Sequence, residues 1–211
     1  RATIKEVTGL DLDARVTSFA RGVQGDIDLA LDCDVDGVTI VVPASDRHIE
    51  RKVGTTREDV RETTVQLVEY AKDHGLWTEV IGEDGSRAEL SFLTTLIGDA
   101  HGAGADRGCF ADTVGHASPD QTHTYVSALA ELGPVSTHTH DDLGLGVMNA
   151  LVSIAAGADL VHGTVNGIGE RAGNVALEEV AIALAHCYDI ETLDLPAIYP
   201  LAQVVSAATG I

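Results

Sequence analysis

Six short runs rich in β-branched residues recur along the chain, and each is followed by residues with helical periodicity. The runs cover residues 14–19, 37–42, 77–81, 107–111, 135–138 and 160–165. The clearest helical stretches cover residues 57–74, 88–103, 119–132, 144–156 and 174–185. Strand–helix units in series, without a linker, predict an α/β fold with a parallel sheet and right-handed crossovers.

Polar residues lie at or just after the carboxyl ends of five of these six runs. They are Ser45, Glu83, Asp84, Asp112, Thr113, His138, His140 and Asn166. An open sheet gathers its ligand at one switch point, whereas a barrel gathers groups from every strand onto one face. The distribution therefore favours a closed barrel over an open, doubly wound sheet.

The number of units is two short of a complete (β/α)8 barrel, which typically needs about 250 residues. The chain has 211 residues, and the helical residues 2–7 precede the first run. We therefore expect residues 1–211 to form one TIM-barrel domain whose first two strands are missing from this sequence.

The charge balance excludes two classes of partner. Asp and Glu total 33 against 13 Lys and Arg, which gives a net charge of −20. Such a chain repels nucleic acid and anionic membranes. The acids are spread along helices and lysine is scarce, a composition typical of proteins from a halophile with a high-salt cytoplasm.

The cysteines and the apolar runs indicate a cytoplasmic protein. Cys33, Cys109 and Cys187 are odd in number and form no CxxC pair, which fits a reducing compartment. No secretory signal opens the sequence, and no apolar run approaches the ~20 residues of a membrane span.

Two histidines in one strand-end run point to a metal site. In a strand, residues i and i+2 face the same side, so His138 and His140 would project together and form half of a divalent-metal site. Asn174, at the start of the next predicted helix, could add an oxygen. A lone His-x-His is more often incidental than functional, but here Asp141 and Asp142 follow it and the Asn174 segment accompanies it.

The motifs together resemble those of the 2-isopropylmalate, citramalate and homocitrate synthase family. The similarity is carried by HTHDDLG at 138–144, GTVNGIGERAGNVALEE at 163–179, EDGSR at 83–87, DTVG at 112–115 and the segment 22–49. The resemblance implies a metal-dependent TIM barrel that condenses acetyl-CoA with a 2-oxo acid, acting as an acyltransferase with acetyl-CoA as co-substrate.

By that resemblance, His138 and His140 are metal ligands, and Asn174 is a further ligand or lies beside the ion. Nitrogen and oxygen ligands without a thiolate suit Mg²⁺ or Mn²⁺ better than a structural zinc site, with Zn²⁺ as a remaining option. Such an ion polarises the keto group as a Lewis acid.

The resemblance also assigns residues around the substrate. Thr113 would hydrogen-bond the carboxylate of the 2-oxo acid, and Glu83 would belong to the catalytic acid/base or orienting set. His48 would line the pocket as a second catalytic candidate. Arg171 is either a substrate ligand or a structural ion-pair partner of Glu170.

Parts of the family pattern are absent from this sequence. The family's first strand carries an Asp-x-x-x-Arg segment with a third metal ligand, and nothing before Val16 matches it. The downstream accessory domain is also not found, and with it the elements that could make the whole protein a homodimer. A non-catalytic barrel remnant is therefore an alternative.

The 2-oxo acid is constrained by two positions before Glu83. Homocitrate synthases carry an Arg-x-Ser pair there, whereas this chain has Glu79 and Ile81, which argues against 2-oxoglutarate. Pyruvate and 2-oxoisovalerate differ only in apolar bulk. A methylene-sized change in a hydrophobic pocket discriminates between substrates by only roughly 1–3 kcal/mol. We expect 2-isopropylmalate synthesis from 2-oxoisovalerate, for leucine biosynthesis, with (R)-citramalate synthesis from pyruvate, for isoleucine biosynthesis, as the alternative.

A dinucleotide-binding function is a competing hypothesis. Gly167, Gly169 and Ala172 satisfy the G-x-G-x-x-A spacing after a strand and before a helix. Glu170 would then face the pyrophosphate, and no strand ending in an acid follows at the expected distance. This fingerprint is weak.

Overall fold

Six parallel strands form one curved sheet in the computed structural model, which describes residues 2–210. The strands are β1 (Thr17–Arg21), β2 (Gly37–Pro43), β3 (Trp77–Glu83), β4 (Arg107–Asp112), β5 (Val135–Thr139) and β6 (Leu160–His162). Each strand pairs in parallel with the next one along the chain, so spatial order equals sequence order. Consecutive order with a crossover helix between neighbours is the arrangement of a barrel wall, and the predicted α/β barrel architecture is confirmed over these strands.

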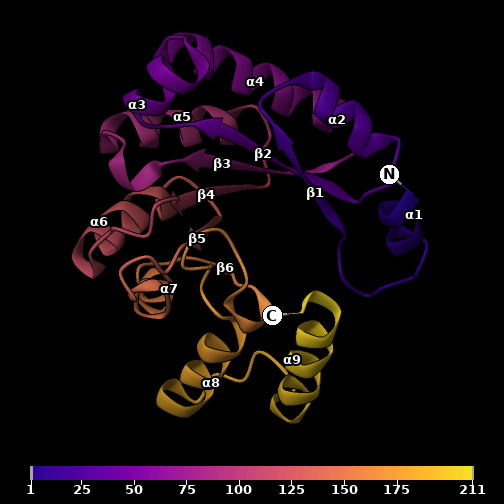
Figure 1. Ribbon diagram of the computed structural model, residues 1–211. Helices are drawn as coiled ribbons and strands as arrows, with labels where there is room; N and C mark the ends of the chain where they lie inside the picture. Colours follow the sequence, from indigo (N-terminus) through magenta and orange to yellow (C-terminus); the bar gives the residue numbers. More distant parts are fainter. Residues whose placement is uncertain (1, 211) are drawn as a thin grey trace.

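The helices lie along the outer side of the arc of strands, and the two terminal helices lie at its ends (Figure 1). They are α1 (Ala2–Thr8), α2 (Gln24–Leu31), α3 (Asp46–His48), α4 (Arg57–Asp73), α5 (Leu90–Gly102), α6 (Pro119–Ala130), α7 (Gly146–Ala155), α8 (Leu177–Tyr188) and α9 (Leu195–Thr209). A π-helical turn (Ile49–Val53) and 3₁₀ turns (Gly85–Arg87, Val165–Gly167) complete the connections. None of the helices in this part of the chain has the length and apolar character needed to cross a membrane.

The main core fills the space between the outer face of the sheet and the helices. Its largest fully buried side chains include Phe110, Ile40, Leu93, Ile97 and Val126. Because side chains alternate along a strand, the strand neighbours of these residues point to the inner face. A small apolar cluster of Ile81, Cys109 and Ala111 lies on that face. The inner face therefore carries a mixture of apolar and polar side chains, and this is where the site forms.

Two predicted helix starts are confirmed in detail. The Thr56 side chain accepts from Asp59 N, and the Asp59 carboxylate accepts from Thr56 N, which makes a capping box at α4. Ser118 accepts from Gln121 N at 3.2 Å, with Pro119 in the first turn of α6. Each cap supplies partners for amide groups that a helix leaves free at its start.

Several boundaries differ from the sequence prediction. The first strand runs Thr17–Arg21 instead of 14–19, and the last one ends at His162. No bounds were predicted for α2 and α3, and α9 was not predicted. The predicted helix at 174–185 starts at Leu177, because the three preceding residues are extended and bridge to neighbouring segments.

Candidate active site

His138 and His140 lie together at the carboxyl end of β5, as predicted. Their ring centroids are 5.2 Å apart, and both side chains line a cavity of about 380 Å³. The cavity is also lined by Phe19, Val41, Ile81, Glu83, Ala111, Thr113, Gly169, Glu170 and Asn174. Side chains from every strand except β6 therefore meet at one end of the sheet, as in a barrel active site.

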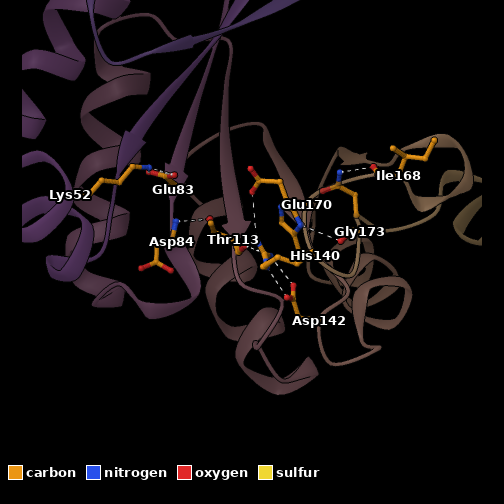
Figure 2. Close-up of polar contacts among 11 residues, drawn as sticks. Lys52, Glu83, Asp84, Thr113, His140, Asp142, Ile168, Glu170 and Gly173 are labelled. Carbon is orange, nitrogen blue, oxygen red and sulfur yellow. Dashed lines mark hydrogen bonds and ion pairs between the residues drawn. The ribbon is translucent and has the colours of Figure 1, made fainter. Parts of the chain in front are cut away.

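The orientation of the His140 ring is set by a backbone carbonyl. Its Nδ1 lies 3.2 Å from Gly173 O, a contact visible in Figure 2. Because a carbonyl oxygen only accepts, Nδ1 carries a proton and donates, so Nε2 is the nitrogen that the neutral ring can offer to a cation. A histidine held in this way presents a defined nitrogen to a metal ion.

His138 is largely buried and neutral. Burial lowers its pKa to about 4, and the neighbouring His162 and His140 rings contribute to that lowering. Its Nδ1 is buried and has no hydrogen-bond partner among the described residues. A neutral ring with an unused polar atom is the form that binds a metal.

Asn174 reaches the two histidines from the loop that precedes α8. It forms an isolated antiparallel bridge with His140, and its Nδ2 donates to Ile168 O at 3.0 Å. Because the amide nitrogen is engaged, Oδ1 faces elsewhere, and it is buried without a partner in the described part of the chain. The expectation that Asn174 opens the helix is wrong, because the Val175 N–H bonds to Thr139 O and holds the segment extended.

The glycines of this loop serve its close packing. A Cβ on Gly173 would lie 2.1 Å from Gly167 O, and one on Gly169 would lie 2.4 Å from Asn174 Nδ2. Gly173 also has φ of +100°, which glycine adopts without strain. The space that a pyrophosphate would need beside Gly169 is filled by Asn174, so the geometry argues against the dinucleotide hypothesis.

The donor set fits a divalent cation. His138, His140 and Asn174 line one cavity, and two of these three residues carry a buried polar atom that has no partner within residues 2–210. Unpaired buried polar atoms are costly, and a bound ion satisfies them. Imidazole nitrogen and amide oxygen suit Mn²⁺ or Mg²⁺.

Glu83 lies at the end of β3, with a lysine that the sequence reasoning missed. Lys52 Nζ donates to both carboxylate oxygens at 2.6 and 2.8 Å (Figure 2). His48 Nδ1 lies 3.2 Å from Glu83 Oε2, and its Nε2 lies 3.7 Å from Asp84 Oδ2. The ring is misaligned for a hydrogen bond, since its buried Nδ1 makes none with the described residues. Glu83 lines the cavity, whereas His48 is not among its lining residues.

Thr113 is positioned by the backbone of the adjacent strand end. Its Oγ1 accepts from Asp84 N at 2.7 Å (Figure 2). The hydroxyl hydrogen can donate to a further acceptor, and Thr113 lines the cavity. A substrate carboxylate is such an acceptor.

Arg171 is held by a carboxylate and a carbonyl. Its Nε and one terminal nitrogen contact the two oxygens of Asp142 at 2.7 and 2.8 Å, and the same terminal nitrogen donates to Thr113 O at 2.7 Å. The contact with Glu170 is longer, at 3.5 Å. Thus the guanidinium ties the His140 loop to the Thr113 turn, and its role as a substrate ligand stays a prediction.

A second set of potential ligands was missed at the sequence level. Glu79, Cys109 and His162 come from three strands, and their ligand atoms lie within 4.8 Å of one another. The sequence offers no local signal for this cluster, because its members are far apart along the chain.

Comparison with protein families supports the motif assignment. A family model described as HMGL-like matches residues 1–205. A putative (R)-citramalate synthase of Methanothermobacter thermautotrophicus is 46% identical over 100% of this chain and 43% of its own length. The (R)-citramalate synthase of Methanocaldococcus jannaschii is 42% identical over 98% of this chain and 43% of its own length. A homocitrate synthase of Methanopyrus kandleri is 42% identical over 100% of this chain and 54% of its own length. The chain thus spans about half the length of these relatives.

Solved structures show the same fold at low sequence identity. The HMG-CoA lyase of Bacillus subtilis has a TM-score of 0.86 and 20% identity, over 100% of this chain and 76% of its own. An HMG-CoA lyase of Acinetobacter baumannii was solved with coenzyme A and 3-methylmalate. It has a TM-score of 0.87 and 20% identity, over 100% of this chain and 74% of its own. With the family model covering residues 1–205 and relatives above 40% identity, the chain belongs to the HMGL-like family.

Proposed function

We propose that this chain supplies most of the active site of a synthase that condenses acetyl-CoA with a short 2-oxo acid. The observation that carries the proposal is the convergence of His138, His140 and Asn174, with unpaired buried polar atoms among the described residues, on one cavity. The names of the relatives, all condensing synthases, support this reaction type.

In the proposed site, His138, His140 and Asn174 hold a divalent cation. When bound, the ion polarises the keto group of the 2-oxo acid as a Lewis acid. Thr113 donates its hydroxyl hydrogen to the substrate carboxylate and so orients the keto carbon. The hydrogen bond from Asp84 N to Thr113 Oγ1 keeps that hydroxyl in place.

Glu83 is the proposed group that moves the proton. Its carboxylate lines the cavity and is held by Lys52, so it can accept a proton from the methyl group of acetyl-CoA. The resulting carbanion attacks the keto carbon, and the alkoxide that forms takes up a proton from solvent. Water then hydrolyses the thioester, which releases CoA and the dicarboxylic acid. No oxidant or reductant is needed for these steps.

Pyruvate is the proposed 2-oxo acid. Two of the relatives reported above are named as citramalate synthases, and this replaces the sequence-based preference for 2-oxoisovalerate. Apolar side chains (Val41, Ile81 and Ala111) line the cavity and suit a small alkyl group. The ionised Glu79, earlier on β3 than Ile81, would repel the distal carboxylate of 2-oxoglutarate.

Release of free CoA thiol tests the proposal directly. The natural protein that contains these residues is assayed with acetyl-CoA, Mn²⁺ and pyruvate, 2-oxoisovalerate or 2-oxoglutarate in turn. We expect the highest kcat/KM with pyruvate. A clear preference for 2-oxoisovalerate would reinstate 2-isopropylmalate synthesis, and no release with any of them would refute the synthase.

A matched pair of histidine variants controls this assay. His138→Ala removes a proposed metal ligand and should reduce kcat/KM by at least about a hundredfold. His123→Ala changes an exposed histidine on α6 and should leave it unchanged. Equal activity of the two variants would remove His138 from the site.

A further inference from the structure

Two members of the cluster of Glu79, Cys109 and His162 lie nearer the amino ends of their strands than the proposed catalytic groups, whereas His162 ends β6 and pairs in register with His138. Glu79 precedes Glu83 on β3, and Cys109 precedes Asp112 on β4. Each of the three residues offers one ligand atom, and all three atoms lie within 4.8 Å of one another. None of these residues binds the proposed catalytic cation or moves a proton in the proposed condensation, in which Glu79 only disfavours 2-oxoglutarate.

Glu79 is held as an ionised carboxylate. Ser136 Oγ donates to Oε1 at 2.6 Å, Thr39 Oγ1 donates to Oε2 at 3.0 Å, and His162 Nε2 lies 3.3 Å from Oε1. Burial raises the pKa of Glu79, but His162, Ser136 and Thr39 together outweigh it and leave the pKa below its ordinary value. Hydroxyl donors behind a carboxylate are the supporting contacts that orient metal-ligating acids.

Cys109 supplies a buried thiol with weak hydrogen-bond contacts. It is a free cysteine, and its Sγ donates to Phe110 O at 3.6 Å. Burial first, and then the charge of Glu79, raise the pKa of this thiol by more than the nearby Ser136 and Arg107 lower it, so it is protonated in the absence of a cation. A thiophilic dication displaces that proton and binds the thiolate.

The geometry and the charge both suit one cation. Tetrahedral zinc, with bonds of about 2.0–2.3 Å, places its nitrogen, oxygen and sulfur ligands about 3.3–3.6 Å apart. The His162 Nε2 to Glu79 Oε1 distance of 3.3 Å already matches. One dication with one thiolate and one carboxylate has no net charge, which makes burial far less costly than for an isolated ion.

A cavity gives access to the cluster. It has a volume of about 530 Å³, and Thr39, Glu79, His138 and His162 are among its lining residues. A cation can therefore reach Glu79 and His162 without opening the main core, and a water molecule can take the fourth position.

We propose that Glu79, Cys109 and His162 form an inner binding site for a thiophilic divalent cation such as Zn²⁺, separate from His138, His140 and Asn174. Binding transfers the Cys109 proton to solvent, with no redox change. Because its ligands come from β3, β4 and β6, the bound ion links three strands of the wall. The site does not depend on the proposed synthase activity.

Cobalt absorption tests the site, because a thiolate bound to Co²⁺ gives a charge-transfer band that nitrogen and oxygen ligands do not. We expect the natural protein, freed of metal and titrated with CoCl₂, to show this band. Cys109→Ser should lose it. Cys187→Ser, at an exposed cysteine, and His140→Ala, in the proposed catalytic site, should both keep it. No band in the folded wild-type protein, or a band that survives in Cys109→Ser, overturns the proposal.

Two further variants cover the case in which Cys109→Ser fails to fold. Ser136→Ala removes one donor to Glu79 and should weaken Zn²⁺ binding, measured against a chromogenic competitor, by about 10–100-fold. Ser127→Ala, on α6, is the matched control and should have no effect. His162→Gln removes a ligand and should weaken binding at least as much as Ser136→Ala. Unchanged Zn²⁺ affinity in folded His162→Gln also overturns the proposal.

Discussion

Burial controls the protonation of His138, and therefore whether its imidazole can bind a cation. Desolvation lowers its pKa to about 4, with further contributions from the rings of His162 and His140. For His140, the contact between its Nδ1 and Gly173 O fixes the orientation of the ring. Burial thus keeps a lone pair available on His138 at neutral pH, and a backbone contact orients His140.

The lowered pKa of His138 predicts a stability change with pH. An unfolded histidine titrates near about 6.5, whereas folded His138 titrates at about 4. Between these values the unfolded state binds more protons, so the free energy of unfolding falls as the pH drops through this window, by about 3 kcal/mol in total.

Urea unfolding of the metal-free protein at pH values from about 7 to about 4 measures this slope. His138→Gln should show a shallower slope than the wild-type protein, whereas His123→Gln, at an exposed site, should keep the wild-type slope. The same slope in wild type and His138→Gln would contradict the assignment.

At the scale of elements, the glycine-containing segment between β6 and α8 places Asn174. The Asn174 N–H donates to Gly167 O, and the Asp141 N–H donates to Gly173 O. These bonds join the segment to the end of β5 across the inner face. The loop is thus a structural clamp that holds Asn174 beside His140.

Gly173→Ala should disrupt this clamp through a steric clash in addition to the backbone strain at a positive φ. A Cβ would lie 2.1 Å from Gly167 O, so the backbone must shift. Gly54 is the matched control, since it has φ of +76° and a Cβ added there would meet no atom within 4 Å. We expect Gly54→Ala to cost about 1 kcal/mol with unchanged Mn²⁺ affinity, and Gly173→Ala to weaken Mn²⁺ binding by about tenfold or more. Calorimetric titration with Mn²⁺ separates the two, and equal affinities would refute the clamp.

At the scale of the whole molecule, the excess of acidic residues determines the electrostatics of the surface. Several of the few basic residues are engaged in ion pairs with Asp or Glu, among them Lys52, Lys72, Arg57, Arg61 and Arg171. Such pairing leaves the net charge of −20 unchanged, so carboxylates outnumber the available cations over the molecule. Repulsion among surface carboxylates opposes the compact state at low ionic strength.

Added KCl should therefore raise the thermal unfolding midpoint. The screening length falls from about 10 Å at 0.1 M salt to about 3 Å at 1 M, which weakens the repulsion. Sucrose is the control, since it stabilises by exclusion from the surface without screening charge. A midpoint that rises with sucrose but not with KCl would exclude a role for the acidic surface.

The sequence by itself determined the features that depend on residues close together in the chain. The alternation of strand and helix, the starts of α4 and α6 and the common face of His138 and His140 all follow from short-range periodicity and spacing. It also contained the motifs that identified the family. The sequence analysis gave no bounds for α2, since its periodicity is weak and the burial of Ile27 and Ala30 against the rest of the molecule decides it. It also did not identify α9.

Tertiary structure decided which distant residues meet. The register of β3, β4, β5 and β6 brings Glu79, Cys109 and His162 together, and the loop before α8 sets Asn174 against His140. The partners of Arg171 and Glu83 were likewise unpredictable, because Asp142 and Lys52 are remote in sequence. Local patterning specifies the elements, whereas sheet curvature, register and loop packing specify contacts between them, and no short-range rule encodes those.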